Sequence, residues 1–273
     1  SALEATMIYS TAGLLKGAGL VTRSPFRAPH HSASDAGLIG GGAVPRPGEV
    51  TLAHHGVLFL DELPEFKRHV LETLREPIEE GRITISRARS TVTFPARFQL
   101  IAAMNPCPCG NANNNGDGCR CPRPVIERYV GKISGPLLDR ISIHVFVRPV
   151  ELSSFAGVRG DSSADMQKEI LCARRAQRAR NGVSPRTAGK GLYSKPPFVL
   201  NARLSEKQMK LFCGLDREGD ALLLKAHKQL GISARGRGHI LRVARTIADL
   251  ESIERIEAPH LAEAIQYRIR ELP

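Results

Sequence analysis

The sequence predicts an α/β fold in its first part, followed by an all-helical part. Three short apolar runs, at residues 56–60, 98–104 and 141–147, have the length of buried strands, and polar residues stand at their ends. Beyond about residue 155 such runs disappear and the apolar spacing becomes helical. We therefore expect an α/β domain over residues 1–155 and a helical domain over residues 156–273, with ample apolar material for a core.

The first part is predicted to contain a strand, a helix and a hairpin in that order. Residues 1–20 have a weak helical pattern, and the Gly-, Pro- and His-rich stretch 23–56 is typical of an ordered loop or insertion. After the strand at 56–60, Pro64 opens a helix whose apolar face carries Phe66, Val70, Leu71 and Leu74. The alternation in "RITIS" and "STVTFPA" then predicts a β-hairpin from Arg82 to Ala96.

The second part is predicted to consist of five helices. Ser233 is a suitable N-cap and Pro259 suits the first turn of the last helix. The five predicted ranges are 162–180, 204–213, 216–230, 233–253 and 259–271. The basic run Arg174, Arg175, Arg178 and Arg180 lies in the first of them, where a solvated helix face is the usual arrangement and DNA contact is a minority alternative.

Charge and composition narrow the classes of partner. Lys and Arg number 39 against 27 Asp and Glu, giving a net charge of +12 and a pI near 9.8, which favours polyanionic partners such as nucleic acid. No apolar run reaches the roughly 18 residues of a membrane span, and the N-terminus lacks a signal-peptide pattern. We expect a cytoplasmic protein without a membrane partner.

Two adjacent carboxylates, Asp61 and Glu62, follow the strand at 56–60. A carboxylate at this position can bind Mg²⁺ through water while the next one orients an attacking water, although an apolar run followed by Asp-Glu is common by itself. Asn105, at the end of the next strand, and Arg140, just before the third, fit a nucleotide site in the same order. Their alternatives are an Asn-Pro turn and a surface ion pair.

A phosphate-binding G-x-x-x-x-G-K-[ST] loop is missing from the sequence. Gly-Lys occurs only at Gly131-Lys132 and Gly189-Lys190, and neither pair is followed by Ser or Thr. Either the chain is a degenerate ATPase or it begins after that loop.

Four of the six cysteines lie between residues 107 and 121 as two C-x-C pairs. Cys107 with Cys109 and Cys119 with Cys121 predict a tetrahedral Zn²⁺ site, with disulfides formed on oxidation and free thiols as alternatives. This layout is not that of a secreted disulfide scaffold. No metal ion is expected to be shared within either of the pairs His30-His31 and His54-His55, because adjacent side chains on an extended segment point in opposite directions, and neither pair is given a catalytic role.

Several longer segments resemble one family. "PFRAPHHSASDAGLIGGG", "PRPGEVTLAHHGVLFLDELPEF", "TVTFPARFQLIAAMNPCPCG", "SGPLLDRISIHV" and "SARGRGHILRVARTIADLE" are similar to the bacterial magnesium-chelatase-like AAA+ ATPases, of the competence-protein type. The resemblance implies a truncated P-loop NTPase core, a parallel sheet with helices and a hairpin insertion, followed by a helical lid. It also implies ATP and Mg²⁺ as cofactors, and a C-terminal fragment that lacks the Walker A loop.

The resemblance implies a role for each candidate residue. Asp61 and Glu62 would be the Walker B pair, Asn105 sensor 1 and Arg140 an arginine finger, while sensor 2 would be Arg235 first and Arg242 second. The hairpin would be a pore-facing insertion, the segment near 27–50 a second insertion, and the DNA candidates are Arg82, Arg87 and Arg89, with a solvated hairpin tip as the alternative.

The implied function is that of a hexameric motor that remodels DNA, as a helicase or branch-migration enzyme in natural transformation or recombination. The alternatives are a magnesium-chelatase-type subunit that drives metal insertion, another protein-remodelling motor, or a non-catalytic binding module. ATP turnover by this chain alone should be negligible. Without the Walker A strand, the strand at 141–147 should lack its usual neighbour, so the sheet either closes up or exposes an edge.

Overall fold

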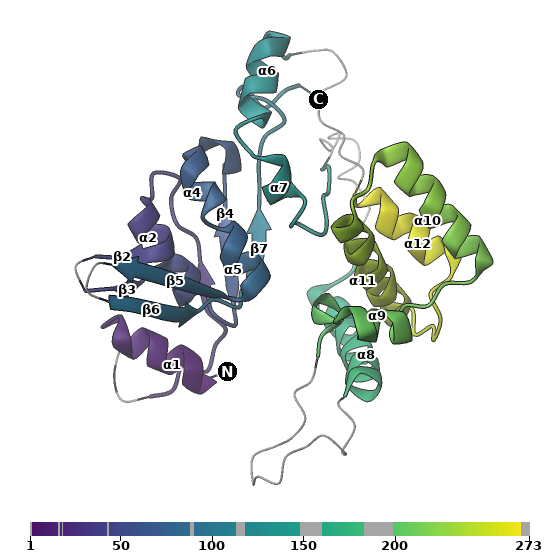
Figure 1. Ribbon diagram of the computed structural model, residues 1–273, viewed down its shortest axis with the longest axis horizontal. Coiled ribbons are helices and arrows are strands. Elements are labelled where there is room, and N and C mark those ends of the chain that lie inside the picture. Colours follow the sequence, from purple (N-terminus) through teal and green to yellow (C-terminus); the bar gives the residue numbers. More distant parts are fainter. Residues whose placement is uncertain are drawn as a thin grey trace, which may run out of the picture. The chain divides into compact units, whose positions relative to one another are not determined.

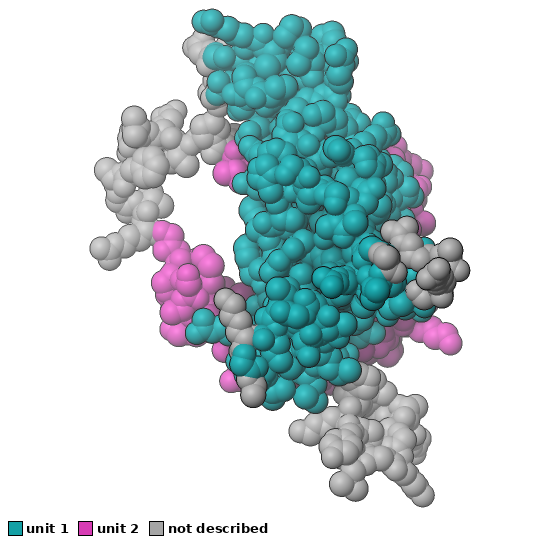
Figure 2. Space-filling view, turned by 90° about the vertical axis from the view of Figure 1, so that its left-hand side faces the viewer, with its two compact units in different colours: residues 1–141, 272–273 teal, residues 142–271 magenta. Residues whose placement is uncertain are grey.

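A computed structural model describes residues 2–15, 17, 19–42, 44–87, 90–112, 118–147, 160–182 and 199–268. The chain divides into two compact units (Figure 2), one formed by residues 1–141 with the last two residues of the chain, and one by residues 142–271. The first unit contains all the described strands, and the second is helical. The α/β fold followed by a helical region is therefore confirmed.

The first unit is built on a small parallel sheet (Figure 1). Its strand order is β1-β4-β7, with β1 at Phe26–Arg27, β4 at Val57–Leu60 and β7 at Gln99–Ala102. Val57 pairs with Gln99 and Leu60 with Ala102, so β4 and β7 end at the same edge of the sheet. The two predicted strands before residue 105 are thus confirmed, and β4 lies between its two neighbours.

The core of the first unit is apolar. Leu58 and Leu60 of β4 are fully buried, and they pack with Phe66, Val70, Leu71 and Leu74, the residues predicted to share one helical face. The single helix predicted there is instead three short ones: η1 at Leu63–Glu65, α4 at Arg68–Glu72 and α5 at Arg75–Glu80. The chain bends between them while the same side chains stay in the core.

The hairpin is confirmed with its predicted boundaries and alternation. Strand β5, Arg82–Arg87, pairs antiparallel with β6, Ser90–Pro95, and Arg82 lies opposite Pro95. Ile83 and Ile85 are buried, whereas the threonines of the other face are exposed. One face of the hairpin therefore belongs to the core and the other is open to solvent.

Residues 23–56 are more regular than predicted. They contain β1 and four further short elements, namely α2 (Asp35–Ile39), β2 (Gly40–Gly41), β3 (Arg46–Pro47) and α3 (Glu49–Leu52). Strands of two residues carry too little alternation to be visible in the sequence. At Gly40 a Cβ would lie 2.4 Å from the Arg46 carbonyl oxygen, so the close pairing of β2 with β3 requires glycine at this position.

The strand predicted at 141–147 is wrong. These residues form no sheet ladder and belong, from Ser142 onward, to the second unit. There the His144 N–H donates to the Tyr267 carbonyl at 2.9 Å, and the Ser142 hydroxyl lies 2.7 Å from His239 Nδ1. An extended segment becomes a strand only beside another strand, and the described residues of this unit offer none.

The second unit is a helical domain with the helices α8 to α12. Their bounds are α8 Ser163–Asn181, α9 Glu206–Phe212, α10 Arg217–Leu230, α11 Ala234–Leu250 and α12 Ala258–Gln266, with the 3₁₀ turn η4 at Asn201–Arg203. All five predicted helices are present, although the last ends at Gln266 and not at 271, with residues 269–271 outside the described residues. The Ser233 side chain caps α11 by accepting a hydrogen bond from the Gly236 N–H. The remaining helices belong to the first unit: α1 Ala2–Thr11, α6 Arg123–Val130 and α7 Gly135–Leu138.

A buried charged network crosses the interior of the helical unit. Asp249, 2% exposed, accepts two hydrogen bonds from Arg180 at 2.6 and 2.7 Å and one from Asn201 at 2.7 Å. Arg245, also buried, donates to Asp249 and to two backbone carbonyls after α11. Arg180 is therefore not part of a solvated face, although Arg174, Arg175 and Arg178 are exposed.

Among the helices in the described ranges, none is long and apolar enough to cross a membrane.

Candidate functional site at the end of the sheet

The candidate nucleotide residues Asp61, Glu62 and Asn105 lie just past the ends of two neighbouring parallel strands. Backbone hydrogen bonds hold these strand ends together: the Ala103 N–H donates to Leu60 at 2.9 Å and the Leu63 N–H donates to Ala103 at 3.0 Å. All three candidate side chains belong to exposed residues. Ligand sites in α/β folds form at this carboxyl edge, so the arrangement is suited to a bound nucleotide.

Glu62 is held in an uncommon backbone conformation. Its φ of 52° and ψ of 46° lie in the left-handed region, which non-glycine residues rarely occupy. The Asp61 carboxylate accepts a hydrogen bond from the Glu62 N–H at 2.9 Å. Strained residues persist where the surroundings fix them, and they cluster at functional sites.

The imidazole of His31 contacts the Glu62 carboxylate, with 3.0 Å between Nδ1 and Oε2. No role is predicted for His31 from the sequence, because residues 30 and 31 are expected to form an extended pair. The centroids of the two rings instead lie 4.0 Å apart with the rings tilted by 35°, and the His31 ring packs nearly perpendicular to the Phe66 ring. A histidine 31 residues upstream of an acidic pair gives no local signal, so only the fold could reveal this contact.

Arg140 is less accessible than an arginine finger would need to be. Its side chain is 9% exposed, and it donates to Glu79 at 2.9 Å and to the Pro136 carbonyl at 2.7 Å. The guanidinium is therefore tied to its own unit. A role toward another subunit requires the Glu79 contact to open.

The two sensor 2 candidates have different environments within α11. Arg235 lies in the first turn and is exposed, whereas Arg242 is half-buried and donates to the Leu204 carbonyl at 2.7 Å. Burial lowers the pKa of Arg242. Arg235 is thus the more exposed of the two candidates, and the Arg242 guanidinium is bonded inside the helical unit.

Of the DNA candidates, only Arg82 has a described side chain. It is 62% exposed and lies 3.4 Å from Glu80. The side chain of Arg87 and all of Arg89 fall outside the described residues.

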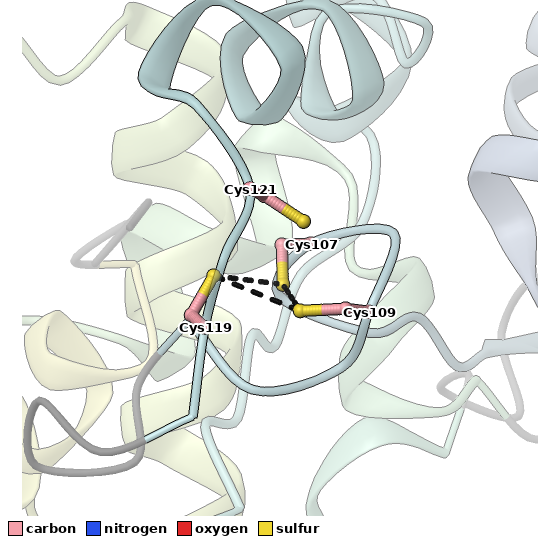
Figure 3. A group of neighbouring side chains, drawn as sticks. All are labelled: Cys107, Cys109, Cys119 and Cys121. Carbon is pink, nitrogen blue, oxygen red and sulfur yellow. Dashed lines mark hydrogen bonds between the residues drawn. The ribbon is translucent and has the colours of Figure 1, made fainter.

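Four cysteine side chains from the segment between β7 and α6 converge on one another (Figure 3). The sulfur atoms of Cys107, Cys109, Cys119 and Cys121 all lie within 4.8 Å of one another. The Cys107 and Cys109 sulfurs are 3.3 Å apart, and each lies 3.7 Å from Cys119. None is in a disulfide.

Hydrogen bonds, first from the backbone of Asn111 and then from the neighbouring thiols, lower the pKa of Cys109 to about 6. Burial and the neighbouring sulfurs raise the pKa of Cys119 to about 11, despite a backbone hydrogen bond with Cys121 that acts in the opposite direction and is the strongest single influence. One thiolate thus forms readily in the cluster, and the next is opposed by it.

The second histidine pair also differs from the prediction. His55 is in the left-handed region, and both His54 and His55 approach Glu4, at 4.0 and 2.7 Å. The segment is a turn, not an extended chain, so the two rings lie 4.0 Å apart. Hydrogen bonding from His55 lowers the pKa of Glu4.

Comparison with known proteins gives two family matches. Residues 1–155 match the family described as magnesium chelatase, subunit ChlI, and residues 160–268 match its C-terminal domain. Together the two matches cover most of the chain.

Individual relatives agree with these matches. The chain is 47% identical to competence protein ComM of Haemophilus influenzae and 45% identical to the uncharacterized protein YifB of Escherichia coli, in each case over 89% of this chain and 45% of the relative. The magnesium-chelatase 38 kDa subunit of Cereibacter sphaeroides is 23% identical over 83% of this chain and 58% of its own length. The chain thus spans about half the length of its YifB and ComM relatives. By these matches, and by its parallel sheet with the acidic pair at its edge, the chain belongs to the magnesium chelatase ChlI family of AAA+ proteins.

Proposed function

We propose that this chain is the C-terminal part of an ATPase that hydrolyses ATP with Mg²⁺ and uses the energy to remodel DNA. The observation that carries the ATPase proposal is that Asp61 and Glu62 follow one strand and Asn105 follows its hydrogen-bonded parallel neighbour, at the same edge of the sheet. A carboxylate, a second carboxylate and an amide at one sheet edge are the groups that bind hydrated Mg²⁺ and orient a water for attack on a phosphate.

In this proposal each residue has a separate task. Asp61 holds Mg²⁺ through water, and Glu62 takes up the proton of the attacking water. Asn105 fixes that water from the neighbouring strand. His31 lies against Glu62 and acts as a positioning residue, since its imidazole keeps the carboxylate in one orientation. Arg235 would contact the nucleotide as sensor 2, with Arg242 as the second choice, and the protein would work in the cytoplasm.

Arg140 acts between subunits in this proposal, which calls for a homo-oligomer, expected to be a hexamer. The Glu79 contact holds the guanidinium in its resting position. When a neighbouring subunit presents the phosphates of its ATP, their charge competes with Glu79 for Arg140. The ion pair would then open and Arg140 would complete the neighbour's site.

DNA is the proposed substrate because of charge and because of the relatives. The chain carries a net charge of +12, and the solvent-facing side of the β5–β6 hairpin bears Arg82. A relative named as a competence protein matches far more strongly than the chelatase subunits do. The second candidate is a chelatase-type motor for metal insertion, which the distant likeness to chelatase subunits supports.

The test measures ATP hydrolysis by the full-length protein, with and without single-stranded and branched DNA. We expect DNA to raise the rate and Glu62→Gln to lower it by about 10²- to 10⁴-fold, the usual range for loss of a catalytic base. Glu65→Gln is the matched control, because Glu65 lies one turn further on, contacts Lys132 and has no role in the site. A rate that Glu62→Gln leaves unchanged would exclude the proposed site.

The proposal that DNA is the substrate can be tested separately from the proposal that the protein hydrolyses ATP. Replacing Arg82, Arg87 and Arg89 together by Ala should weaken DNA binding. Each phosphate that an arginine no longer neutralises should also reduce the salt dependence of the affinity by about one unit of slope. Hydrolysis that requires Glu62 but ignores every form of DNA would favour the chelatase-type alternative.

A further inference from the structure

The cysteine cluster lies next to the proposed nucleotide site but is not part of it. Cys107 follows Asn105 by two residues, and Cys121 directly precedes Pro122, the N-cap of α6. The cluster therefore connects the end of the sheet to the helix that follows. No step of ATP hydrolysis needs thiols, so these four side chains call for a separate explanation.

The spacing of the sulfur atoms is that of a tetrahedral metal site. Zn–S bonds of about 2.3 Å at tetrahedral angles put the sulfur atoms about 3.8 Å apart. Two of the observed separations are 3.7 Å, and all four sulfurs fit within 4.8 Å. A disulfide would need a separation of about 2.05 Å, which none of the pairs approaches.

The surroundings also favour a metal over four free thiols. Cys107 is fully buried, and its sulfur faces other sulfurs rather than an ordinary hydrogen-bond acceptor. Thiols are weak donors and acceptors, so a cluster of four gains little from mutual contacts alone. A divalent ion that prefers thiolates supplies the missing attraction, and Zn²⁺ is the usual occupant of a closed four-cysteine site.

We propose that Cys107, Cys109, Cys119 and Cys121 bind one structural Zn²⁺, which fastens the chain after β7 to the chain before α6. Each sulfur gives up its proton on binding, so the site carries a net charge of −2. Arg120 and Arg123, which flank Cys121 in the sequence, partly offset this charge. With all four positions taken by protein, the ion is closed to substrates and acts only in folding.

The test is the metal content of the chain, purified under reducing conditions and measured by elemental analysis and by mass spectrometry of the folded protein. We expect about one Zn²⁺ per chain, falling to less than about 0.1 in Cys109→Ser and Cys121→Ser. Cys172→Ser is the matched control, because Cys172 is an exposed cysteine on α8 in the other unit and should leave the content unchanged.

A second measurement does not depend on variants that fold. Exchange of the bound ion for Co²⁺ in the unaltered chain should give the visible absorption of a tetrahedral thiolate site. Three results would each overturn the proposal. The first is zinc-free protein that gives no Co²⁺ absorption, the second is a mass lower by two hydrogens for each disulfide formed, and the third is iron in place of zinc. Because metal content is measured without ATP, the test of the zinc site does not depend on whether the protein is an ATPase.

Discussion

The two units place their charged side chains in opposite ways. Among the described residues of the first unit, no Asp, Glu, Lys or Arg is buried, and Asp61 and Glu62 stand exposed at the sheet edge. In the helical unit, Asp249 and Arg245 are enclosed and satisfied by one another, by Arg180 and by Asn201. An exposed carboxylate remains available for a ligand, whereas an enclosed one is used up by its partners. If the proposed function is correct, the same residue type serves catalysis in one unit and stability in the other.

The strongest test of this difference is to replace one aspartate by asparagine in each unit and compare the loss of stability. Asp249→Asn removes the charge that compensates Arg245 and should destabilise the helical unit by about 3–5 kcal/mol. Asp61→Asn keeps an acceptor oxygen at an exposed site and should cost less than about 0.5 kcal/mol. Denaturant unfolding followed by circular dichroism measures both. Equal costs would show that the Asp249 network contributes no more than a surface group does.

A smaller contrast exists within the first unit between a half-buried and an exposed arginine. Arg140→Ala removes two charge-assisted hydrogen bonds and leaves Glu79 without this partner, so we expect a destabilisation of about 1.5–3 kcal/mol. Arg123, with a side chain 90% exposed, pairs with Glu127 on α6, and Arg123→Ala should cost less than about 0.5 kcal/mol. Differential scanning calorimetry should rank the two transitions accordingly. The opposite order would mean that Arg140 is not held as described.

Two helix C-caps allow the units to be compared at the backbone. Gly81 after α5 and Gly231 after α10 both have a φ above 60°. Gly231→Ala meets nothing within 4 Å and should cost about 1–2 kcal/mol from its conformation alone. Gly81→Ala also brings a Cβ to 3.0 Å from Arg97 Cγ, so its cost should be the larger of the two. The midpoints of urea unfolding would test this order, provided that the dependence of the unfolding free energy on urea concentration is the same in both variants. The order would be reversed only if the Arg97 side chain moved away at no cost.

The smallest expected effect is a dependence of stability on pH in the first unit. Hydrogen bonding from Ser134, and then from Arg75, lowers the pKa of Glu72 below its ordinary value of 4.5. A carboxyl with a lowered pKa stabilises the fold above that ordinary value and ceases to do so as the pH falls through the folded value. The stability advantage of the wild type over Glu72→Gln should therefore be below about 1 kcal/mol at neutral pH and vanish in acid. Urea titrations at both pH values would measure it, and an advantage that grew in acid would reverse the sign of the argument.

Patterns over a few residues of the sequence predicted most of the secondary structure. The buried strands, the hairpin with its alternation, the five C-terminal helices and the Ser233 cap all follow from spacing over a few residues. The acidic pair was located for the same reason. The strand at 141–147 failed because an apolar run reports burial without saying what lies beside it, and here the segment bonds to Tyr267.

Contacts between side chains far apart in the sequence could not be predicted from such patterns. His31 with Glu62, Arg140 with Glu79 and Arg180 with Asp249 are separated by 31, 61 and 69 residues. The fold brings each pair together, and neither member signals the other along the chain. For Arg140 and Arg180, the sequence showed a cation but not the carboxylate that holds it.

The backbone of Glu62 sets stability against function at a single residue. A left-handed conformation costs a residue with a side chain about 1–2 kcal/mol relative to glycine, so Glu62→Gly should make the folded chain harder to unfold. The same change removes the carboxylate on which we expect turnover to depend. A screen of this protein for heat tolerance alone would therefore tend to select against Glu62, the proposed catalytic base, and only a screen that also measures hydrolysis would retain it.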